Sequence, residues 1–265
     1  MRLSPQSGEI IDRSSPLPFT WNGKPLTGHV GDTIVSAMAA SGVKVFSRSL
    51  KYHRKRGILT ANYLDPNTIL QVDDEPNVRA GHRRLEAGMN VSSQNTWPSL
   101  EFDVKSANQA VGRFLAPGFY YKTFISPRPM WPMYQRVLRR FSHGGRIDDQ
   151  VTSDHYDKRY AHPDVVVAGA GPAGMAAAIA AAKAGASVML VEEEYRLGGH
   201  LRYGSADDLE ALATLLAEVE ANNNIEVLAN SVVGARYDDN WIMINQRDPG
   251  HVRERLISAR AKTLV

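Results

Sequence analysis

The stretch VVVAGAGPAGMAAA at residues 165–178 decides the fold, because it joins an apolar run, a glycine-rich turn and an alanine-rich run. Gly169, Gly171 and Gly174 have the spacing GxGxxG. In a strand–turn–helix unit the first glycine allows the tight turn, the second lets the backbone approach a pyrophosphate, and the third lets the helix lie close to the sheet. The helix N-terminus then offers N–H groups to the phosphates. The stretch therefore predicts a Rossmann-type domain that binds an adenine dinucleotide.

An acidic residue follows at the distance such a domain needs. Seventeen residues separate Gly174 from Glu192, which lies at the end of a second predicted strand. Its carboxylate can accept hydrogen bonds from both ribose hydroxyls and would repel a 2′-phosphate, which favours NAD or FAD over NADP. After five more residues comes Gly198-Gly199, preceded by Arg196, a spacing similar to that of the flavoprotein disulfide reductase superfamily. By motif alone FAD is favoured, and NAD stays open because both ligands share the adenosine half.

The residues expected to contact the dinucleotide lie in the glycine turn, at the end of the second strand and in the later glycine pair. They are Ala168, Gly169, Ala170, Gly171, Pro172, Ala173, Gly174, Glu192, Glu193, Arg196, Gly198 and Gly199. The other acids beside Glu192, including Glu194, are interpreted as solvated charge. No catalytic residue can be assigned, because no catalytic constellation accompanies the turn.

Helix and strand patterns alternate around the glycine turn. The alanine-rich helix is predicted to reach Ala184, with Gly185 as its C-cap, and a second helix is predicted over 206–221. Strands are predicted over 164–168, 187–192, 225–228, 231–237, 241–245 and 256–259. The domain is assigned to residues 161–265. Because the chain stops in a strand, we expect this domain to be incomplete at its C-terminus.

Residues 1–96 predict a small β-grasp domain. A strand over 17–21, the turn Asn22-Gly23 and a strand ending at Gly28 form a predicted hairpin. Asp32 or Thr33 caps a helix closed by Gly42, and a strand is predicted over 43–46. Residues 97–160 are rich in proline and aromatic side chains, which predicts an irregular connector packed over the domains or against a partner. One short helix is predicted there, over 134–141.

Composition excludes several function classes. No apolar run is long enough to cross a bilayer and the N-terminus lacks a signal peptide pattern, so we expect no membrane association and a cytoplasmic location. The formal charge is +3, with basic residues clustered between Arg48 and Arg56. That cluster is interpreted as a solvated loop or a surface for an anion or an acidic partner. Nucleic-acid binding is not expected, because no recognition motif accompanies the cluster.

The metal chemistry open to the chain is also narrow. The sequence has no cysteine, which excludes disulfides and cysteine-ligated clusters. The eight histidines lack metal-ligand spacing and are interpreted as ordinary surface residues. No metal site is therefore predicted.

Several stretches together resemble the α subunit of heterotetrameric sarcosine oxidase. The resemblance runs along nearly the whole chain, and its tryptophan, proline and aromatic stretches are more specific than the glycine turn. These stretches lie at 31–34, 39–42, 48–53, 56–58, 75–80, 93–100, 117–123 and 158–162.

This resemblance implies an oxidoreductase acting on CH–NH groups, which oxidises sarcosine to glycine with hydrogen peroxide and methylenetetrahydrofolate as further products. It implies NAD at the glycine turn of the α subunit, FAD on a partner subunit and FMN at their interface. On that ground NAD replaces FAD as the expected ligand, and the other subunits are the expected partners. The N-terminal domain of the family resembles a [2Fe-2S] ferredoxin. Related dehydrogenases carry cluster cysteines just after the counterpart of Arg56-Gly57, so a cluster-free domain is expected here.

The family's α subunit is several times longer and ends in a folate-binding domain. We therefore interpret the chain as a fragment, a truncated frame or a split subunit, inactive alone. Two alternatives remain open. One is a subunit of an opine- or hydroxyproline-type dehydrogenase that binds FAD at the same turn. The other is a non-catalytic remnant or assembly subunit.

Overall fold

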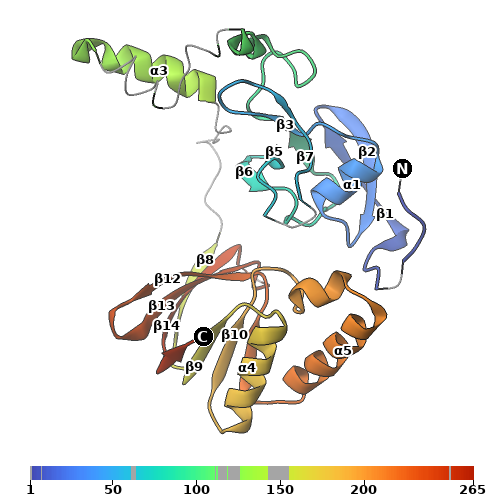
Figure 1. Ribbon diagram of the computed structural model, residues 1–265, viewed down its shortest axis with the longest axis vertical. Coiled ribbons are helices and arrows are strands. Elements are labelled where there is room, and N and C mark those ends of the chain that lie inside the picture. Colours follow the sequence, from blue (N-terminus) through green and yellow to red (C-terminus); the bar gives the residue numbers. More distant parts are fainter. Residues whose placement is uncertain are drawn as a thin grey trace. The chain divides into compact units, whose positions relative to one another are not determined.

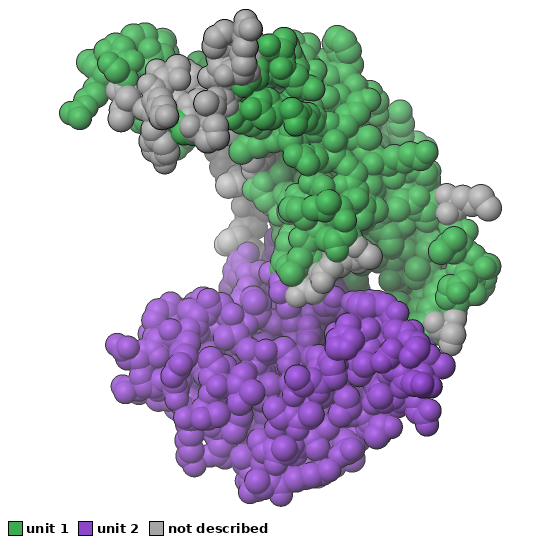
Figure 2. All heavy atoms as spheres, in the orientation of Figure 1, with its two compact units in different colours: residues 1–151 green, residues 152–265 purple. Residues whose placement is uncertain are grey.

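The computed structural model describes the chain except residues 1, 7, 61–63, 111, 113–117, 119–125, 143–154 and 251, and for residues 140–142 it describes the backbone alone. The chain divides into two compact units, residues 1–151 and 152–265 (Figure 2). Each unit has its own hydrophobic core, the first in one cluster and the second in two.

The first unit is built on a five-stranded mixed sheet of order β2-β1-β7-β5-β6, as in a β-grasp fold. β1 (Asp12–Trp21) and β2 (Lys24–Val30) form the predicted hairpin, with positive φ at both Asn22 and Gly23. β1 pairs in parallel with β7 (Asn90–Ser92). β5 (Ile69–Val72) then pairs antiparallel with β7 and with β6 (Glu75–Arg79).

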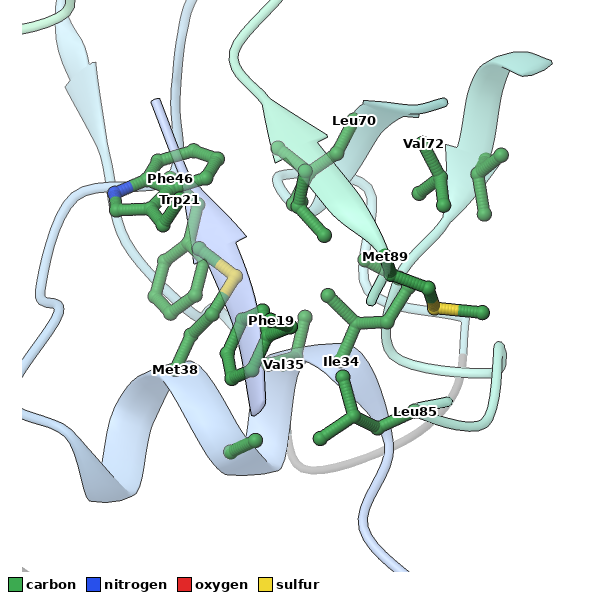
Figure 3. Close-up of a cluster of buried hydrophobic side chains, with 14 of the residues drawn as sticks. Phe19, Trp21, Ile34, Val35, Met38, Phe46, Leu70, Val72, Leu85 and Met89 are labelled. Atoms are coloured by element: carbon green, nitrogen blue, oxygen red, sulfur yellow. The ribbon is translucent and has the colours of Figure 1, made fainter. Parts of the chain in front are cut away.

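One helix covers this sheet. In α1 (Ile34–Ala40) the Thr33 hydroxyl accepts from the Ser36 N–H and the Ser36 side chain accepts from the Thr33 N–H, which confirms the predicted cap. Ile34, Ala37 and Met38 of this helix are fully buried. Figure 3 shows side chains of β1, α1 and β5 gathered into one core.

The predicted strand over 43–46 is wrong. The strand β3 begins just after the predicted range ends. It spans only Ser47–Arg48 and pairs with β4 (Lys55–Arg56). Val43 and Val45 pack against the core and Phe46 is fully buried, all from irregular backbone. The apolar, β-branched pattern there therefore marked burial and not sheet pairing.

The segment predicted as an irregular connector contains more regular structure than expected. In the described part of this segment, the 3-10 helices η1 (Val104–Gln109) and η3 (Arg128–Met130) precede α3 (Trp131–Ser142), which includes the predicted short helix. Tyr156–Ala161 forms strand β8, which the sequence analysis missed. No proline falls between 133 and 162, so the composition that suggested irregular chain does not extend to β8. Most of the aromatic stretch at 116–124 lies outside the described residues.

The second unit contains the glycine turn and has three layers (Figure 1). Its central sheet is parallel, of order β11-β10-β9-β15. These strands are β9 (Val165–Ala168), β10 (Val188–Val191), β11 (Ile225–Leu228) and β15 (Thr263–Leu264). α4 (Pro172–Lys183) and α5 (Ala206–Glu220) cover one face. α4 begins and ends close to the predicted limits, with Gly185 in a left-handed conformation after it.

A second sheet covers the other face, with order β12-β13-β14-β8. It comprises β12 (Ser231–Tyr237), β13 (Trp241–Arg247), β14 (Glu254–Arg260) and β8, with the short η5 (Asp238–Asn240) between β12 and β13. Successive residues of β9 face the two layers in turn: Val166 packs against this second sheet and Val167 against the helices. Burial on both faces explains why β9 and β10 are apolar throughout.

Two strands cross from the second sheet to the central one side by side. β8 leads into β9, and β14 leads into β15. β8 and β14 are parallel before the crossing, and β9 and β15 are parallel after it. At the crossing Lys262 Nζ lies 2.7 Å from Asp164 Oδ1, and the Lys262 N–H donates to the Asp164 carbonyl oxygen. From the crossing, β9 runs to its carboxyl end, where the glycine turn begins.

Candidate functional site

The three glycines of the turn differ in what surrounds them. Gly169 has φ +108°, a left-handed conformation that favours glycine, and its N–H donates to the Val191 carbonyl oxygen at 2.7 Å. A Cβ on Gly174 would lie 1.9 Å from the Gly169 carbonyl oxygen, so α4 starts in direct contact with the turn. A Cβ on Gly171 would meet nothing within 4 Å. The space beside Gly171 is therefore where a ligand can approach the backbone.

The start of α4 is suited to an anion. Gly171 is the N-cap and Pro172 occupies the first turn, where its missing N–H costs no helical hydrogen bond. Ala173 and Gly174 also lie in that turn, in which N–H groups have no acceptor within a helix. Together with the helix dipole, these groups favour a phosphate at this point.

Glu192 lies directly after β10 and only 9% of it is exposed. Its Oε2 accepts from the Ala170 N–H at 2.7 Å, and its Oε1 accepts from the Glu194 N–H at 2.9 Å. The carboxylate is thus fixed beside the glycine turn. An ionised carboxylate has about four lone-pair positions, so each oxygen can accept a further hydrogen bond from a ribose hydroxyl.

Gly198 and Gly199 lie against the glycine turn although more than twenty residues separate them from it along the chain. The Gly198 N–H donates to the Ala170 carbonyl oxygen at 2.8 Å, and a Cβ on Gly199 would lie 3.2 Å from the Gly171 Cα. A Cβ on Gly198 would lie 2.7 Å from the Leu212 Cδ1 of α5. The two predicted glycine groups therefore form one surface.

The remaining predicted residues, Ala168, Glu193 and Arg196, differ in their exposure. Ala168 ends β9 and is exposed, and its N–H donates to the Val265 carbonyl oxygen. Glu193 is half-buried and Arg196 is exposed. The Arg196 carbonyl oxygen accepts from Arg202 Nη1 at 3.4 Å.

The interpretation of Glu194 as solvated charge is wrong. Its carboxylate pairs with the Arg202 guanidinium, and the side chains of Glu194 and Arg202 are only 16% and 18% exposed. The Tyr203 hydroxyl lies 3.4 Å from the other carboxylate oxygen. Arg202 and Tyr203 belong to the 3-10 helix η4 (Gly199–Tyr203). No motif in the sequence pointed to either residue.

The basic cluster of the first unit is divided between its interior and its surface. Arg54, Lys55 and Arg56 are exposed, whereas Arg48 and His53 are buried. Arg48 donates to the carbonyl oxygens of Leu100, Glu101 and His53, each at 2.9 Å. His53 Nδ1 lies 2.7 Å from Asp103 Oδ2. The prediction of a solvated loop is therefore wrong for these two residues, which join the loop to residues 100–103.

The first unit is expected to lose stability in mild acid because of His53. Burial lowers the pKa of His53 below its usual 6.5, outweighing the Asp103 carboxylate, while Lys105 and Arg48 lower it further. The unfolded chain therefore binds this proton more readily, so the stabilisation is present above about pH 6.5 and is lost as the pH falls below it. We expect the urea concentration at the unfolding midpoint to decrease when the pH is lowered from 7.5 to 5.5. The decrease should be larger for the wild type than for His53→Gln. Equal pH dependence in both proteins would contradict this assignment.

Metal and membrane features can be stated for the described part of the chain. It has no cluster of His, Asp and Glu side chains suited to a metal ion. Within the same residues, no helix combines the length and the apolar character needed to span a bilayer.

The fold defines a class: a ferredoxin-like domain followed by an α/β domain similar to those of FAD dependent oxidoreductases. Residues 14–96 match the family described as 2Fe-2S iron-sulfur cluster binding domain, and residues 164–213 match the FAD dependent oxidoreductases. Along nearly its whole length, the chain is a homologue of the α subunits of sarcosine oxidases.

The α subunit from Rhizobium meliloti (strain 1021) is 42% identical over 255 residues, which cover 92% of this chain and 26% of that protein. The one from Corynebacterium sp. (strain U-96) is 29% identical over 98% of this chain and 24% of its own length. This chain thus spans about a quarter of the length of these relatives. A crystal structure of L-proline dehydrogenase from P. horikoshii has the same fold, with a TM-score of 0.59 at 16% identity over 94% of this chain and 40% of that one.

The residues of the first unit do not fit the iron–sulfur cluster that its family description implies. Such clusters are held by cysteine thiolates, and the sequence has no cysteine. After Gly57 the buried Asp65 carboxylate organises the backbone instead. Its Oδ2 accepts from the N–H groups of Leu59 and Thr60, and its Oδ1 accepts from that of Asn67 at 2.8 Å. The Asp65 carboxylate therefore joins residues 59–60 to residues 65–67.

Proposed function

We propose that this chain is the dinucleotide-binding part of an oxidoreductase that acts on the CH–NH group of sarcosine. The observation that carries the proposal is the joint surface of the glycine turn, Glu192 and the Gly198-Gly199 pair. The similarity to sarcosine oxidase α subunits supports the class of reaction and the substrate. The adenine dinucleotide would place its pyrophosphate at the N-terminus of α4 and its ribose at Glu192.

The site residues divide by role. Gly169, Ala170, Gly171, Pro172, Ala173 and Gly174 would surround the pyrophosphate, with Ala168 and the pair Gly198-Gly199 at its edges. Glu192 would accept from the ribose hydroxyls, and Glu193 and Arg196 would lie towards the adenosine. When bound, the dinucleotide supplies hydride-transfer chemistry. This chain's residues bind and orient it, and no residue of the chain is assigned to the chemical step.

Two kinds of similarity point to different dinucleotides at this site. The match over residues 164–213 supports FAD. The resemblance to sarcosine oxidase α subunits implies NAD instead, and in both cases the adenosine half makes the same contacts. Glu192 disfavours NADP, because a 2′-phosphate would face a carboxylate that is already fixed by two backbone N–H groups.

The test is direct binding to the purified chain, by calorimetric titration with NAD, FAD and NADP and by mass analysis of any ligand released on denaturation. We expect FAD or NAD to bind and NADP to bind at least about tenfold more weakly, the effect of one unfavourable charge contact. Glu192→Ser should narrow that difference. If none of the three ligands binds, or if NADP binds as well as the other two, the proposed site is wrong.

Turnover is proposed to need the other subunits of a sarcosine oxidase-like complex, including one that bears FAD and an interface that holds FMN. The chain's share of the complex would be the dinucleotide site described above. Peroxide formation from sarcosine should then be absent with the purified chain alone. Peroxide production by the chain alone would contradict this division of labour.

The first unit is proposed to keep the ferredoxin-like shape without the cluster. Anaerobic reconstitution of the chain with iron and sulfide, followed by desalting, should leave no stoichiometric iron, because the chain has no thiolate to bind it. A plant-type ferredoxin treated in parallel is the positive control. A stoichiometric absorbance band from bound iron and sulfide in this chain would contradict the proposal.

A further inference from the structure

Glu194 and Arg202 close a loop that carries the second glycine pair. We call this ion pair the clasp. Arg202 pairs with the Glu194 carboxylate and also donates to the Arg196 carbonyl oxygen at 3.4 Å, so it contacts the loop at two points. The Arg202 guanidinium lies 5.6 Å from the centre of the Tyr203 ring. Desolvation and the Glu194 carboxylate raise the pKa of Tyr203.

Both ends of the clasp are anchored in the second unit. The Glu194 carbonyl oxygen accepts from the Asn230 N–H at 2.9 Å, just after β11, and the Glu194 N–H donates to Glu192. On the other side Leu201, next to Arg202, is buried in the core formed with α4 and α5. The stretch between these two anchors carries Gly198 and Gly199, which lie against the glycine turn.

That stretch includes two adjacent glycines with positive φ, +119° at Gly198 and +52° at Gly199. Glycine has the widest choice of backbone conformations, so such a pair does not hold its own position. The Gly198 N–H donates to the Ala170 carbonyl oxygen, and Ala170 in turn donates to Glu192. The clasp is a side-chain interaction that closes the loop around this contact.

We propose that the clasp positions Gly198 and Gly199 on the glycine turn and thereby sets the affinity of the site for its dinucleotide. Arg202 and Glu194 are positioning residues in this account, since they act through the loop and not through the ligand. The inference rests on the proposed dinucleotide site. It adds two residues that the glycine motif does not include.

The test measures dinucleotide affinity in Arg202→Gln, Glu194→Gln, the double variant and Arg202→Lys, with NAD and FAD as the probes. We expect each glutamine variant to raise the Kd about tenfold, within the range of couplings between distinct sites. The double variant should add little to either single variant, because both remove the same interaction. Arg202→Lys should restore most of the affinity, since it keeps the charge.

The matched control is Arg255→Gln. It breaks another arginine–carboxylate pair in the same unit, in which Arg255 contacts Asp157 at 2.8 and 2.9 Å. This variant should leave the Kd unchanged. Hydrogen exchange at the Gly198 and Gly199 amides, followed without ligand, should be faster in Arg202→Gln than in the wild type or Arg255→Gln.

The outcomes separate this inference from the proposed function. If the wild type binds dinucleotide and the Arg202 and Glu194 variants bind it equally well, the clasp is only structural and the inference is overturned. The inference is also overturned if Arg255→Gln loses dinucleotide affinity and thermal stability to the same extent as the Arg202 and Glu194 variants. If the wild type binds no dinucleotide, the proposed function itself fails. If Arg202→Gln does not fold, Glu194→Gln decides the matter, because it removes the same ion pair. An unchanged Kd and unchanged exchange at Gly198 and Gly199 in that variant would overturn the inference.

Discussion

Replacing Gly171 by valine is expected to weaken dinucleotide binding by at least about 100-fold, while the free energy of unfolding changes by only about 1 kcal/mol. The fold should tolerate the change for two reasons. Gly171 has φ −70° and ψ 179°, an extended conformation open to any residue, and a Cβ there meets nothing within 4 Å. The ligand should not tolerate it, because the same space is where the pyrophosphate approaches the backbone.

Titration of the variant by calorimetry, with urea unfolding of the same preparation, checks both halves of this prediction. Gly171→Ala provides an intermediate case with a smaller obstruction. Unchanged affinity in the valine variant would show that the ligand does not bind at the turn. A large loss of stability would instead show that valine disturbs the turn itself.

Gly174→Ala is expected to reduce stability as well as binding, with a loss of about 3 kcal/mol or more in the stability of the second unit. The added Cβ would lie 1.9 Å from the Gly169 carbonyl oxygen, and a backbone atom cannot move aside as the end of a side chain can. Either α4 shifts or the turn opens, and in both cases dinucleotide binding should be lost as well.

Scanning calorimetry is the measurement for this variant, because the chain divides into two units. The transition of residues 152–265 should move to lower temperature, and that of the first unit should stay. Gly171→Ala is the matched control, since it adds the same methyl group three residues earlier in open space. Similar stability in Gly174→Ala and Gly171→Ala would contradict the close contact between helix and turn.

The sequence was sufficient for most of the second unit. The patterns that predicted it are local: a glycine spacing, an alanine-rich run and two apolar runs. The helix and both strands lie where these patterns predicted them. The hairpin at Asn22-Gly23 and the Thr33 cap were predictable for the same reason, because a single turn or cap depends on neighbouring residues. The strand expected over 43–46 failed because burial, and not pairing, selected its apolar side chains.

The contacts that shape the candidate site were less accessible to sequence reasoning. Glu194 and Arg202 are eight residues apart, and they belong to no common helix or strand, because Glu194 lies in irregular chain and Arg202 in η4. Their partnership depends on where the loop turns back. The buried Arg48 and His53 were equally hidden, since their partners lie at residues 100–103. A local charge count cannot distinguish such residues from the exposed Arg54 beside them.

The paired crossing of β8 and β14 into β9 and β15 has a consequence for the order of assembly on the ribosome. Strands β8 and β14 meet across 98 residues, as the Arg255–Asp157 contact shows. Contacts this distant in sequence form slowly, because a long loop must close before they stabilise anything. The glycine turn and α4 emerge early in synthesis, but β9 has no neighbour on its outer side until residues 263–264 arrive. During translation that edge would be open to mispairing, which makes this unit a candidate client for a nascent-chain chaperone.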